Sequence, residues 1–474
     1  MFPAGSHLPP ALYKGLHLGF PIFAFSYCAF FVHKCIIGHP FSAVKCLLRK
    51  NSFYFSACFS VFFALEYKKR RLSTMNGQYE ESGASKAGKQ RIIRQGYQGI
   101  PRFYTFWEVF FMEAGRVYNF NPGPATLPLE VLKEAQAEFL NFNNSGMSIL
   151  EISHRAPQYA AVHEKAKQDI KELMGLGDDY EVLFCQGGAS QQFAMIPLNF
   201  ATKEHPGSYV LSGSFAEKAY KEAEHLGVGE IVASSKETGY HHVPQQSELK
   251  IDRNAAYVHV CYNNTIYGTE YHYIPETNGV PLFADMSSDM LSRPIDFHKF
   301  DFIYAGVQKN LGPAGVVLVV AKKSLLENSP ESLPTMFRYS TFYKKDSLYN
   351  TPPAFCIYMV GKVAAWIKSQ GGLEEMARRN ERKAKVVYDA IDSSNGFYRG
   401  HADKDSRSFM NVTFRLPSEE LEKKFIAEAL THQLSGVKGH RSVGGMRASI
   451  YNAMPYEGAV ALADFMEKFR KENA

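Results

Sequence analysis

The run IYAGVQKNLGPAG, from Ile303 to Gly315, indicates the fold more strongly than any other part of this 474-residue chain. Its first half is apolar and reads as a buried strand, and Lys309 stands between that strand and the turn-forming GPAG at 312–315. The lysine amine is therefore expected to emerge where the strand ends. In open α/β sheets, ligands bind at the carboxyl ends of the strands.

A second charged residue, Asp285, directly follows the apolar stretch Val280–Ala284 and is expected at the same edge. Pyridoxal phosphate chemistry most needs two protein groups: a lysine that forms an imine with the cofactor aldehyde, and an acid that keeps the pyridine nitrogen protonated. Taken singly, such residues are more often a surface lysine and a turn aspartate. The interpretation therefore depends on the surrounding sequence.

From Arg116 onward, strand-like runs alternate with helical stretches such as Ala160–Met174 and Ala216–His225. The alternation predicts an α/β fold with a mostly parallel sheet. The predicted strands are Glu181–Phe184, Tyr209–Leu211, Ala256–Cys261, Val280–Ala284, Phe302–Ala305 and Val316–Val320.

Gly371-Gly372 marks a boundary, beyond which a smaller α+β domain is expected. Its predicted elements are a charged helix at Leu373–Ile391, a strand at Asn411–Phe414, and helices at Ser418–Leu430 and Tyr456–Lys471. We therefore expect an N-terminal extension at 1–115, an N-terminal segment with the large domain at 116–371, and a small C-terminal domain at 372–474.

Residues 1–115 differ in charge from the rest of the chain. They hold 14 of the 53 Lys/Arg and 5 of the 47 Asp/Glu, so the extension carries +9 and the remainder −3. The slightly acidic remainder gives no reason to expect a nucleic-acid partner. The seven cysteines include no CxxC pair, which favours reduced thiols over a disulfide framework. No metal site is expected.

The extension lacks acidic residues before Glu66, a composition typical of an organelle-targeting leader. The location therefore stays open between the cytoplasm and the stroma of a plastid or another organelle. The apolar run at 18–32 is short for a bilayer crossing and contains Pro21, so no stable membrane span is expected. Met75 and Met112 are alternative start sites to Met1.

The stretch CQGGASQQF, at 185–193, reads as a strand end, a glycine pair and a helix start. Small residues let the backbone approach an anion, and amides at a helix start bind phosphate oxygens. A glycine pair alone is more often a plain turn, so this motif gains weight only from its neighbours.

Seven motifs in one order resemble those of the phosphoserine aminotransferase family, a class-V, fold-type-I group of pyridoxal phosphate enzymes. The likeness runs from about Arg116 to Ala474. The motifs are NFNPGPATLP (119–128), SHR (153–155), QGGAS (186–190), FADMSS (283–288), AGVQKN (305–310), NTPP (350–353) and GHRSVGGMRASIYNAMP (439–455).

The resemblance implies a large α/β domain, a small α+β domain and a pyridoxal 5'-phosphate site. Lys309 would form the imine, and Asp285 would hold the pyridine nitrogen. The resemblance also gives further cofactor contacts, and it implies that the last two come from the neighbouring subunit of a homodimer with shared active sites. They are Ala189, Ser190 and Gln308 at the phosphate, Thr265 at the phenolic oxygen, Phe215 on the ring face, and Asn350 and Thr351 at the phosphate.

The same resemblance implies basic substrate contacts. Arg447 would bind the substrate α-carboxylate, for which a planar guanidinium is well suited. The distal anion would be held by His154, Arg155, His440 and Arg441. The implied reaction converts 3-phosphohydroxypyruvate and L-glutamate to O-phospho-L-serine and 2-oxoglutarate, in L-serine biosynthesis.

Three residues depart from the family's usual pattern. Phe215 replaces a common tryptophan, Asn264 removes a negative charge beside Thr265, and Asp289 stands where a neutral residue is commoner. Two alternatives stay open. Another class-V enzyme, such as a serine:glyoxylate aminotransferase or a cysteine desulfurase, would share the lysine and the acid but would have no reason for the anion-binding cluster. A non-catalytic paralogue is the other alternative.

Overall fold

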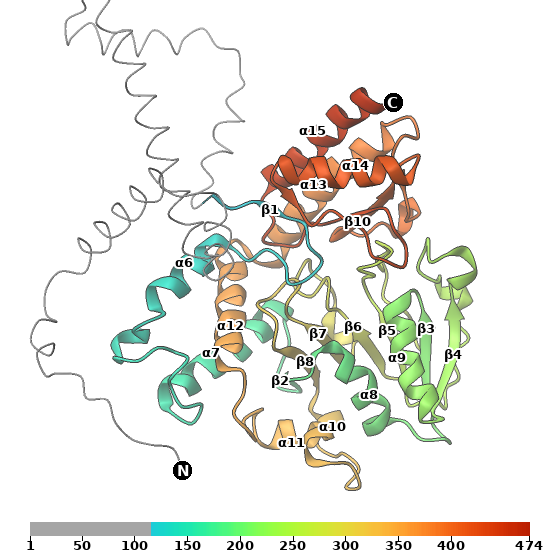
Figure 1. Cartoon of the computed structure of the whole chain (residues 1–474). Coiled ribbons are helices and arrows are strands. Elements are labelled where there is room, and N and C mark those ends of the chain that lie inside the picture. The colour runs from blue at the N-terminus through green and yellow to red at the C-terminus, as the bar shows by residue number, and fades with distance from the viewer. Residues whose placement is uncertain (1–114) are drawn as a thin grey trace, which may run out of the picture. The chain divides into compact units, whose positions relative to one another are not determined.

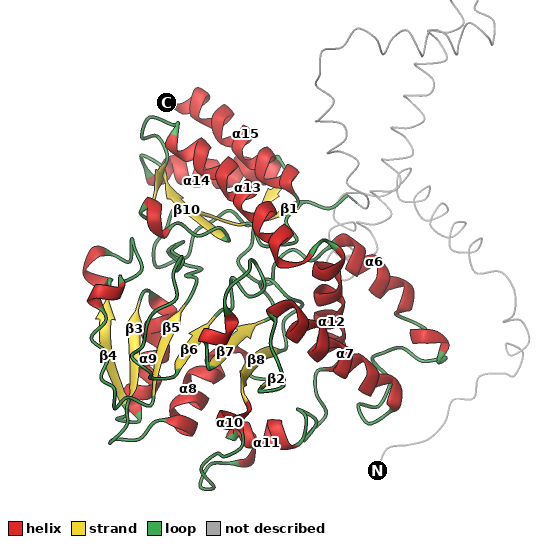
Figure 2. Ribbon diagram, turned by 180° about the vertical axis from the view of Figure 1, so that it is seen from behind, coloured by secondary structure: helices red, strands yellow, loops and turns green. Residues whose placement is uncertain are grey.

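A seven-stranded sheet forms the centre of the described chain, which comprises residues 115–474 of a computed structural model. The predicted leader, the apolar run at 18–32 and the alternative starts Met75 and Met112 lie outside the described residues. The strands follow the order β2-β8-β7-β6-β5-β3-β4, and Figure 2 shows them side by side in this order. They are β2 (Tyr180–Cys185), β3 (Gly207–Leu211), β4 (Gly229–Ser234), β5 (Tyr257–Cys261), β6 (Leu282–Asp285), β7 (Phe302–Gly306) and β8 (Val317–Lys322).

Only β8 runs against its neighbours β2 and β7, and the other pairings within this sheet are parallel. Both faces of the sheet are buried, because alternate residues of one strand enter two different apolar cores. In β7, Ile303 packs into one core, and Phe302 and Tyr304 pack into the other. This arrangement confirms the predicted α/β class with a mostly parallel sheet.

Helices cover the two faces of the sheet (Figure 1). On one face, α7 (Pro157–Met174) packs against α12 (Ala354–Ser369), and both contribute to the core that holds Ile303. On the other face lie α8 (Gly188–Phe200) and α9 (Ser214–His225), which share the core of Phe302 and Tyr304. The remaining helices of this part are α6 (Leu129–Glu138), α10 (Lys323–Leu326) and α11 (Tyr339–Lys344).

The C-terminal part has its own three-stranded antiparallel sheet and its own apolar core. Its elements are β9 (Arg399–Gly400), β10 (Asn411–Arg415), β12 (Met446–Ser449), α13 (Gly372–Asp392), α14 (Glu419–Thr431) and α15 (Tyr456–Asn473). Among the described helices, none is both long and apolar enough to cross a membrane. The domain limits at 115 and 371 stay predictions.

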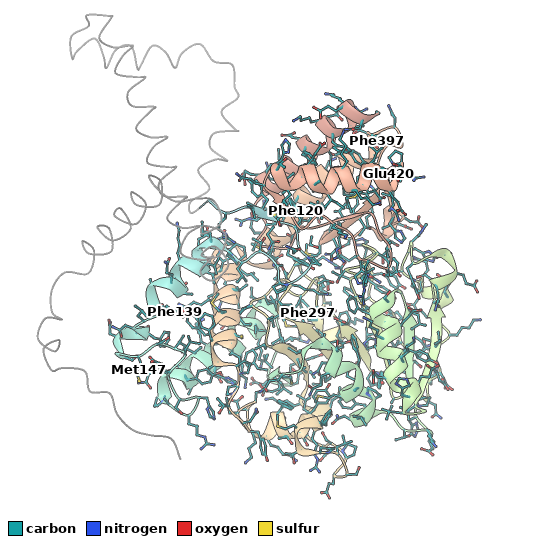
Figure 3. The ribbon with its side chains drawn as sticks, viewed as in Figure 1. Phe120, Phe139, Met147, Phe297, Phe397 and Glu420 are labelled. Atoms are coloured by element: carbon teal, nitrogen blue, oxygen red, sulfur yellow. The ribbon has the colours of Figure 1, made fainter. Side chains whose placement is uncertain are left out.

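The first described strand belongs to this C-terminal core rather than to the large sheet. β1 (Tyr118–Asn119) pairs in parallel with β11 (Leu434–Ser435), and Phe120 is fully buried among the C-terminal residues (Figure 3). The chain then crosses to α6 through the NFNPGPATLP motif. This crossing brings the motif past the end of β7, where Lys309 lies.

Candidate active site

The predicted cofactor residues lie on loops that leave the carboxyl ends of the sheet strands. Cys261, Asp285 and Tyr304 stand opposite one another at the ends of β5, β6 and β7. Asp285 is the last residue of its strand, and the loops after β5 and β7 carry Thr265 and Lys309. The sheet register therefore brings the lysine, the acid and the threonine to one edge.

Lys309 points at two other predicted residues. Its Nζ donates a hydrogen bond of 2.7 Å to Thr265 Oγ1 and lies 5.1 Å from the centroid of the Phe215 ring. Burial lowers the pKa of the Lys309 amine, and Asp285 opposes this effect through its negative charge. A lowered pKa increases the share of neutral amine, which is the form that attacks a carbonyl carbon.

The acid and the lysine loop share a hydrogen-bonded support. The Asp285 carboxylate accepts the Ser287 backbone N–H at 2.9 Å, and the Ser287 hydroxyl accepts the Gly306 N–H at 3.0 Å. Ser287 thus links the turn after β6 to the end of β7. This link limits how far the acid and the lysine can move apart.

The NFNPGPATLP motif closes over the lysine loop. Ala125 N–H donates to the Gln308 carbonyl at 3.0 Å, and a Cβ at Gly123 would lie 3.2 Å from Lys309 Cγ. Gly123 has a φ of 143°, a region that favours glycine. Glycine is therefore needed here both for its conformation and for the close approach of the backbone to the lysine.

The start of α8 supplies amides for an anion. Gly187 and Gly188 have φ values of 82° and 70°, and no side chain caps the helix, so the amides at Ala189 and Ser190 keep their donors. β2 and β7 run in the same direction on either side of β8, two strand spacings or about 10 Å apart, so this helix start and Lys309 follow the same edge of the sheet. Uncapped amides, the Phe215 ring, a buried acid and an amine of lowered pKa fit pyridoxal phosphate.

Arg447 reaches the same site from the small domain. It lies on β12, its side chain is buried, and Nη1 donates to the Thr265 carbonyl at 3.1 Å. Its Nε is buried without a hydrogen-bond partner, and burial lowers the pKa of its guanidinium. A buried donor without a partner is costly, so a bound carboxylate would satisfy it.

His440 and Arg441, two further predicted substrate-binding residues, lie near Arg447. His440 hydrogen-bonds Ser442 Oγ through Nδ1 at 2.6 Å. Partial burial lowers the pKa of the His440 imidazole, as do the positive charges of Arg447, Arg441 and Lys218. Arg447, Arg441 and Lys218 therefore lie near His440, and Lys218 also lies near the Phe215 ring. An anion would be favoured in this region.

The sequence prediction missed Lys218. This exposed side chain lies one turn into α9, and its Nζ is 5.2 Å from the centroid of the Phe215 ring. Residues three apart on a helix share a face, and this spacing from Phe215 is the signal that would have found Lys218.

Four predicted residues lie apart from this group within one chain. In residues 115–474, no hydrogen bond, ion pair or ring contact joins His154, Arg155, Asn350 or Thr351 to Lys309 or its neighbours. His154 Nε2 and Asn350 Oδ1 are nevertheless buried without hydrogen-bond partners. Such atoms are usually paired.

The structure gives physical reasons for two of the three departures from the family's usual pattern, Asn264 and Asp289. Asn264 donates to the Ser212 carbonyl at 2.8 Å, a bond that a carboxylate could not make. A Cβ at Gly213 would overlap the same amide, so glycine is required just before α9. Asp289 is fully buried, and burial raises the pKa of its carboxyl well above the usual value, with Glu270 adding to the rise. Burial therefore favours the uncharged form of the Asp289 carboxyl.

A lysine and an acid at the carboxyl edge of a mostly parallel sheet, completed by an arginine from a small second domain, define a fold-type-I pyridoxal phosphate enzyme. The family model for class-V aminotransferases matches residues 117–462. The chain is 55% identical over 359 residues to a phosphoserine aminotransferase of Geobacillus kaustophilus, covering 76% of this chain and 99% of that protein.

Two solved structures agree. Phosphoserine aminotransferase from Bacillus circulans subsp. alkalophilus is 53% identical with a TM-score of 0.75, covering 76% of this chain and 99% of that one. The enzyme from Trichomonas vaginalis, with pyridoxal phosphate bound, is 38% identical with a TM-score of 0.70, covering 74% and 100%. The chain belongs to the phosphoserine aminotransferase family. The predicted family, fold class, enzyme class and cofactor are confirmed.

Proposed function

We propose that this protein transfers the amino group of L-glutamate to 3-phosphohydroxypyruvate, giving O-phospho-L-serine and 2-oxoglutarate in L-serine biosynthesis. The observation that carries the proposal is the line of contacts from Arg447 through Thr265 to Lys309. Through Thr265, these contacts connect the Arg447 guanidinium, which would bind a carboxylate, to the Lys309 amine. A 2-amino or 2-keto acid held by Arg447 would thus present its α-carbon towards Lys309.

Bound pyridoxal phosphate supplies an aldehyde that carries the amino group and a ring that accepts electrons. Lys309 Nζ takes a proton from the substrate α-carbon and returns it during the exchange. The Asp285 carboxylate would hold the pyridine nitrogen protonated, and the α8 amides, with Gln308, would bind the phosphate. Phe215 would cover the ring face, and Thr265 Oγ1 would hold the phenolic oxygen.

The distal anion distinguishes this reaction from those of other class-V enzymes. The substrates carry either a phosphate or a second carboxylate. Arg441 and Lys218 supply positive charge near His440, and Lys218 lies 5.2 Å from the centroid of the Phe215 ring. An enzyme for alanine or glyoxylate would have no distal anion to hold. This cationic group therefore favours the phosphorylated substrate.

A coupled assay tests the proposal directly. Purified protein with pyridoxal phosphate should form O-phospho-L-serine from 3-phosphohydroxypyruvate and L-glutamate, and it should turn over L-alanine with glyoxylate far more slowly. Faster turnover of the second pair would favour another class-V activity. No turnover of either pair, from protein that binds the cofactor, would favour the non-catalytic paralogue.

We further propose a homodimer with shared sites, supported by an apolar surface beside the lysine loop. A hollow of about 630 Å³ is lined by residues of α6, the start of α12 and the lysine loop, including Leu132, Phe139, Pro313 and Phe355. Leu140 is 82% exposed beside it, and Phe139 and Met147 lie at this edge of the molecule (Figure 3). Solvent-exposed apolar patches of this kind mark interaction sites.

A second copy seated on this surface would lie next to the NTPP segment at 350–353, which directly precedes α12. That copy would then be in a position to receive Asn350 and Thr351. The cellular location, cytoplasm or organelle stroma, is a separate question. It can be tested by fusing residues 1–75 to a fluorescent reporter. Organelle signal supports a leader, and diffuse cytosolic signal supports the cytoplasm.

A further inference from the structure

Three consecutive backbone carbonyls in the turn after β6 each accept a hydrogen bond from a different asparagine side chain. The carbonyls belong to Met290, Leu291 and Ser292. Their donors are Asn310 Nδ2 at 2.7 Å, Asn452 Nδ2 at 2.8 Å and Asn380 Nδ2 at 2.9 Å, respectively. We call Asn310, Asn380 and Asn452 the asparagine cluster.

The cluster is also bonded internally and is closed to solvent. Asn310 Oδ1 accepts the Asn452 backbone N–H at 2.9 Å, and Asn452 Oδ1 accepts Asn380 Nδ2 at 2.8 Å. The three residues are 6%, 1% and 5% exposed in chain order. Buried amides are usually hydrogen-bonded, and here every side-chain amide group of the cluster has a partner except Asn380 Oδ1, which is buried without one. Such networks favour one arrangement of the segments that they join.

Two members of the cluster, and the turn that they hold, belong to segments that also carry a residue of the site. Asn310 directly follows Lys309, Asn452 lies a short way beyond Arg447, and the turn that they hold begins at Asp285. Asn380 lies on α13 of the small domain. One turn along that helix, Lys383 donates to the carbonyls of Ile450 and Tyr451 at 2.9 and 2.6 Å. α13 therefore holds the segment that leads from β12 to Asn452.

We propose that Asn310, Asn380 and Asn452 are positioning residues that fix Lys309, Asp285 and Arg447 relative to one another across the two domains. None of the three is assigned to substrate or cofactor. They act through the backbone of the turn at 290–292. The conformation of that turn supports this role, because Leu291 has a φ of 56°, which non-glycine residues adopt only when their surroundings hold them.

The experiment removes the small-domain member, Asn380→Ala, which leaves the Ser292 carbonyl and Asn452 Oδ1 without their donor. We expect kcat to fall about 10- to 100-fold, the loss that follows a small misplacement of reacting groups. In cofactor-free protein, hydrogen exchange of peptides covering 286–293 and 307–312 should become faster. The matched control is Glu381→Ala, an exposed neighbour on the same helix, which should change neither quantity.

Two outcomes would overturn the proposal. One is an unchanged kcat, and the other is faster exchange confined to α13 and 450–455, because either leaves the lysine loop uncoupled from Asn380. If Asn380→Ala does not fold, Asn380→Ser retains a short donor and is judged by the same two measurements. The kcat measurement rests on the proposed function. An inactive wild-type protein would refute that function, whereas the exchange measurement still decides the role of the cluster.

Discussion

Lys309 combines three features that suit a reactive amine: a lowered pKa, a hydroxyl partner in Thr265 and an aromatic face in Phe215. Lys309→Ala should leave a folded protein that still binds pyridoxal phosphate without a covalent bond. Its multiple-turnover rate should fall to a trace, because imine exchange and proton transfer both use this amine. Steady-state assay and cofactor titration measure the two effects. Turnover near the wild-type rate would refute the role of Lys309.

Arg441 tests whether one anion site serves both half-reactions. Arg441→Ala should lower kcat/KM for 3-phosphohydroxypyruvate and for glutamate together, by about 10- to 150-fold for the loss of a bond to a charged group. Lys423→Ala removes an exposed positive charge from α14 and serves as the control. If both substrates keep their kcat/KM in Arg441→Ala, the arginine is a structural charge.

Lys383 makes the stability of the fold depend on pH. Burial lowers the pKa of its amine from 10.5 to about 7, so between these values the folded chain has released a proton that the unfolded chain still holds. Unfolding then takes up a proton, and the free energy of unfolding rises with pH across this window, by at most ~1.4 kcal/mol per pH unit.

The Lys383→Met variant should lack this contribution. The difference in Tm, wild type minus variant, should therefore become more positive as the pH rises from about 7 to 10. Lys385→Met, an exposed change on the same helix, should show no such trend. A difference that is flat or falls with pH would mean that the folded lysine keeps its proton.

The positions of residues next to strand ends could be predicted from the sequence. Hydrogen bonds between residues far apart in the chain could not. Lys309 and Asp285 follow apolar runs, so the sequence alone placed both at the carboxyl edge of the sheet. The bonds from Asn380 to Ser292 and from Lys383 to Ile450 join segments far apart in the chain. No local pattern encodes such contacts, because they depend on how segments distant in the chain pack together. The roles of the individual site residues stay predictions.

At the scale of elements, each predicted strand and helix has a counterpart whose limits differ by a few residues at most. The sequence analysis did not predict β4 or α12. β4 (Gly229–Ser234) is an edge strand with mostly exposed side chains, so it lacks the continuous apolar run of its neighbours. α12 is buried along much of its surface and therefore shows little alternation between apolar and polar faces. Short buried strands were found by their continuous apolar runs, whereas an exposed edge strand and a long buried helix give neither that signal nor a clear periodicity.

The start of α8 gives a prediction of its own. Gly188→Ala places a side chain at a φ of 70°, where no neighbouring atom lies within 4 Å of the new Cβ, so the penalty is conformational and amounts to about 1–2 kcal/mol. Relaxing this strain would turn the helix amides away from an anion. The affinity for pyridoxal phosphate should fall, as measured by titration.

Gly175→Ala is the matched control, because Gly175 caps α7 with a φ of 67° and an equally open Cβ position. It should lower Tm by a similar amount and leave the cofactor affinity unchanged. Equal losses of affinity in both variants would mean that Gly188 affects the fold in general rather than the phosphate site.

At the scale of the whole molecule, shared sites predict complementation between inactive variants. Lys309→Ala is mixed with the double variant Asn350→Ala/Thr351→Ala under conditions shown to exchange subunits. A hybrid dimer collects every defect in one site and leaves the other intact. Random pairing makes half of the dimers hybrid, so about a quarter of the wild-type activity should return.

Each variant alone, taken through the same exchange procedure, is the control and should stay inactive. If the mixture also stays inactive although hybrids form, Asn350 and Thr351 serve their own chain. The proposed sharing of sites would then be wrong, whereas the reaction itself would be unaffected.

The pairing of β1 with β11 sets an order on biosynthesis. Tyr118 leaves the ribosome long before its partner Leu434, and at 5–20 residues per second the roughly 316 residues between them take about 16–60 s to translate. β2 also waits for β8, its sole neighbour in the sheet. The nascent chain therefore emerges with Tyr118 and Phe120 uncovered and with the hydrogen-bonding edge of β2 unpaired. Chaperones that bind apolar segments would have their longest access here, and the C-terminal core can close around Tyr118 only after Leu434 has been synthesised.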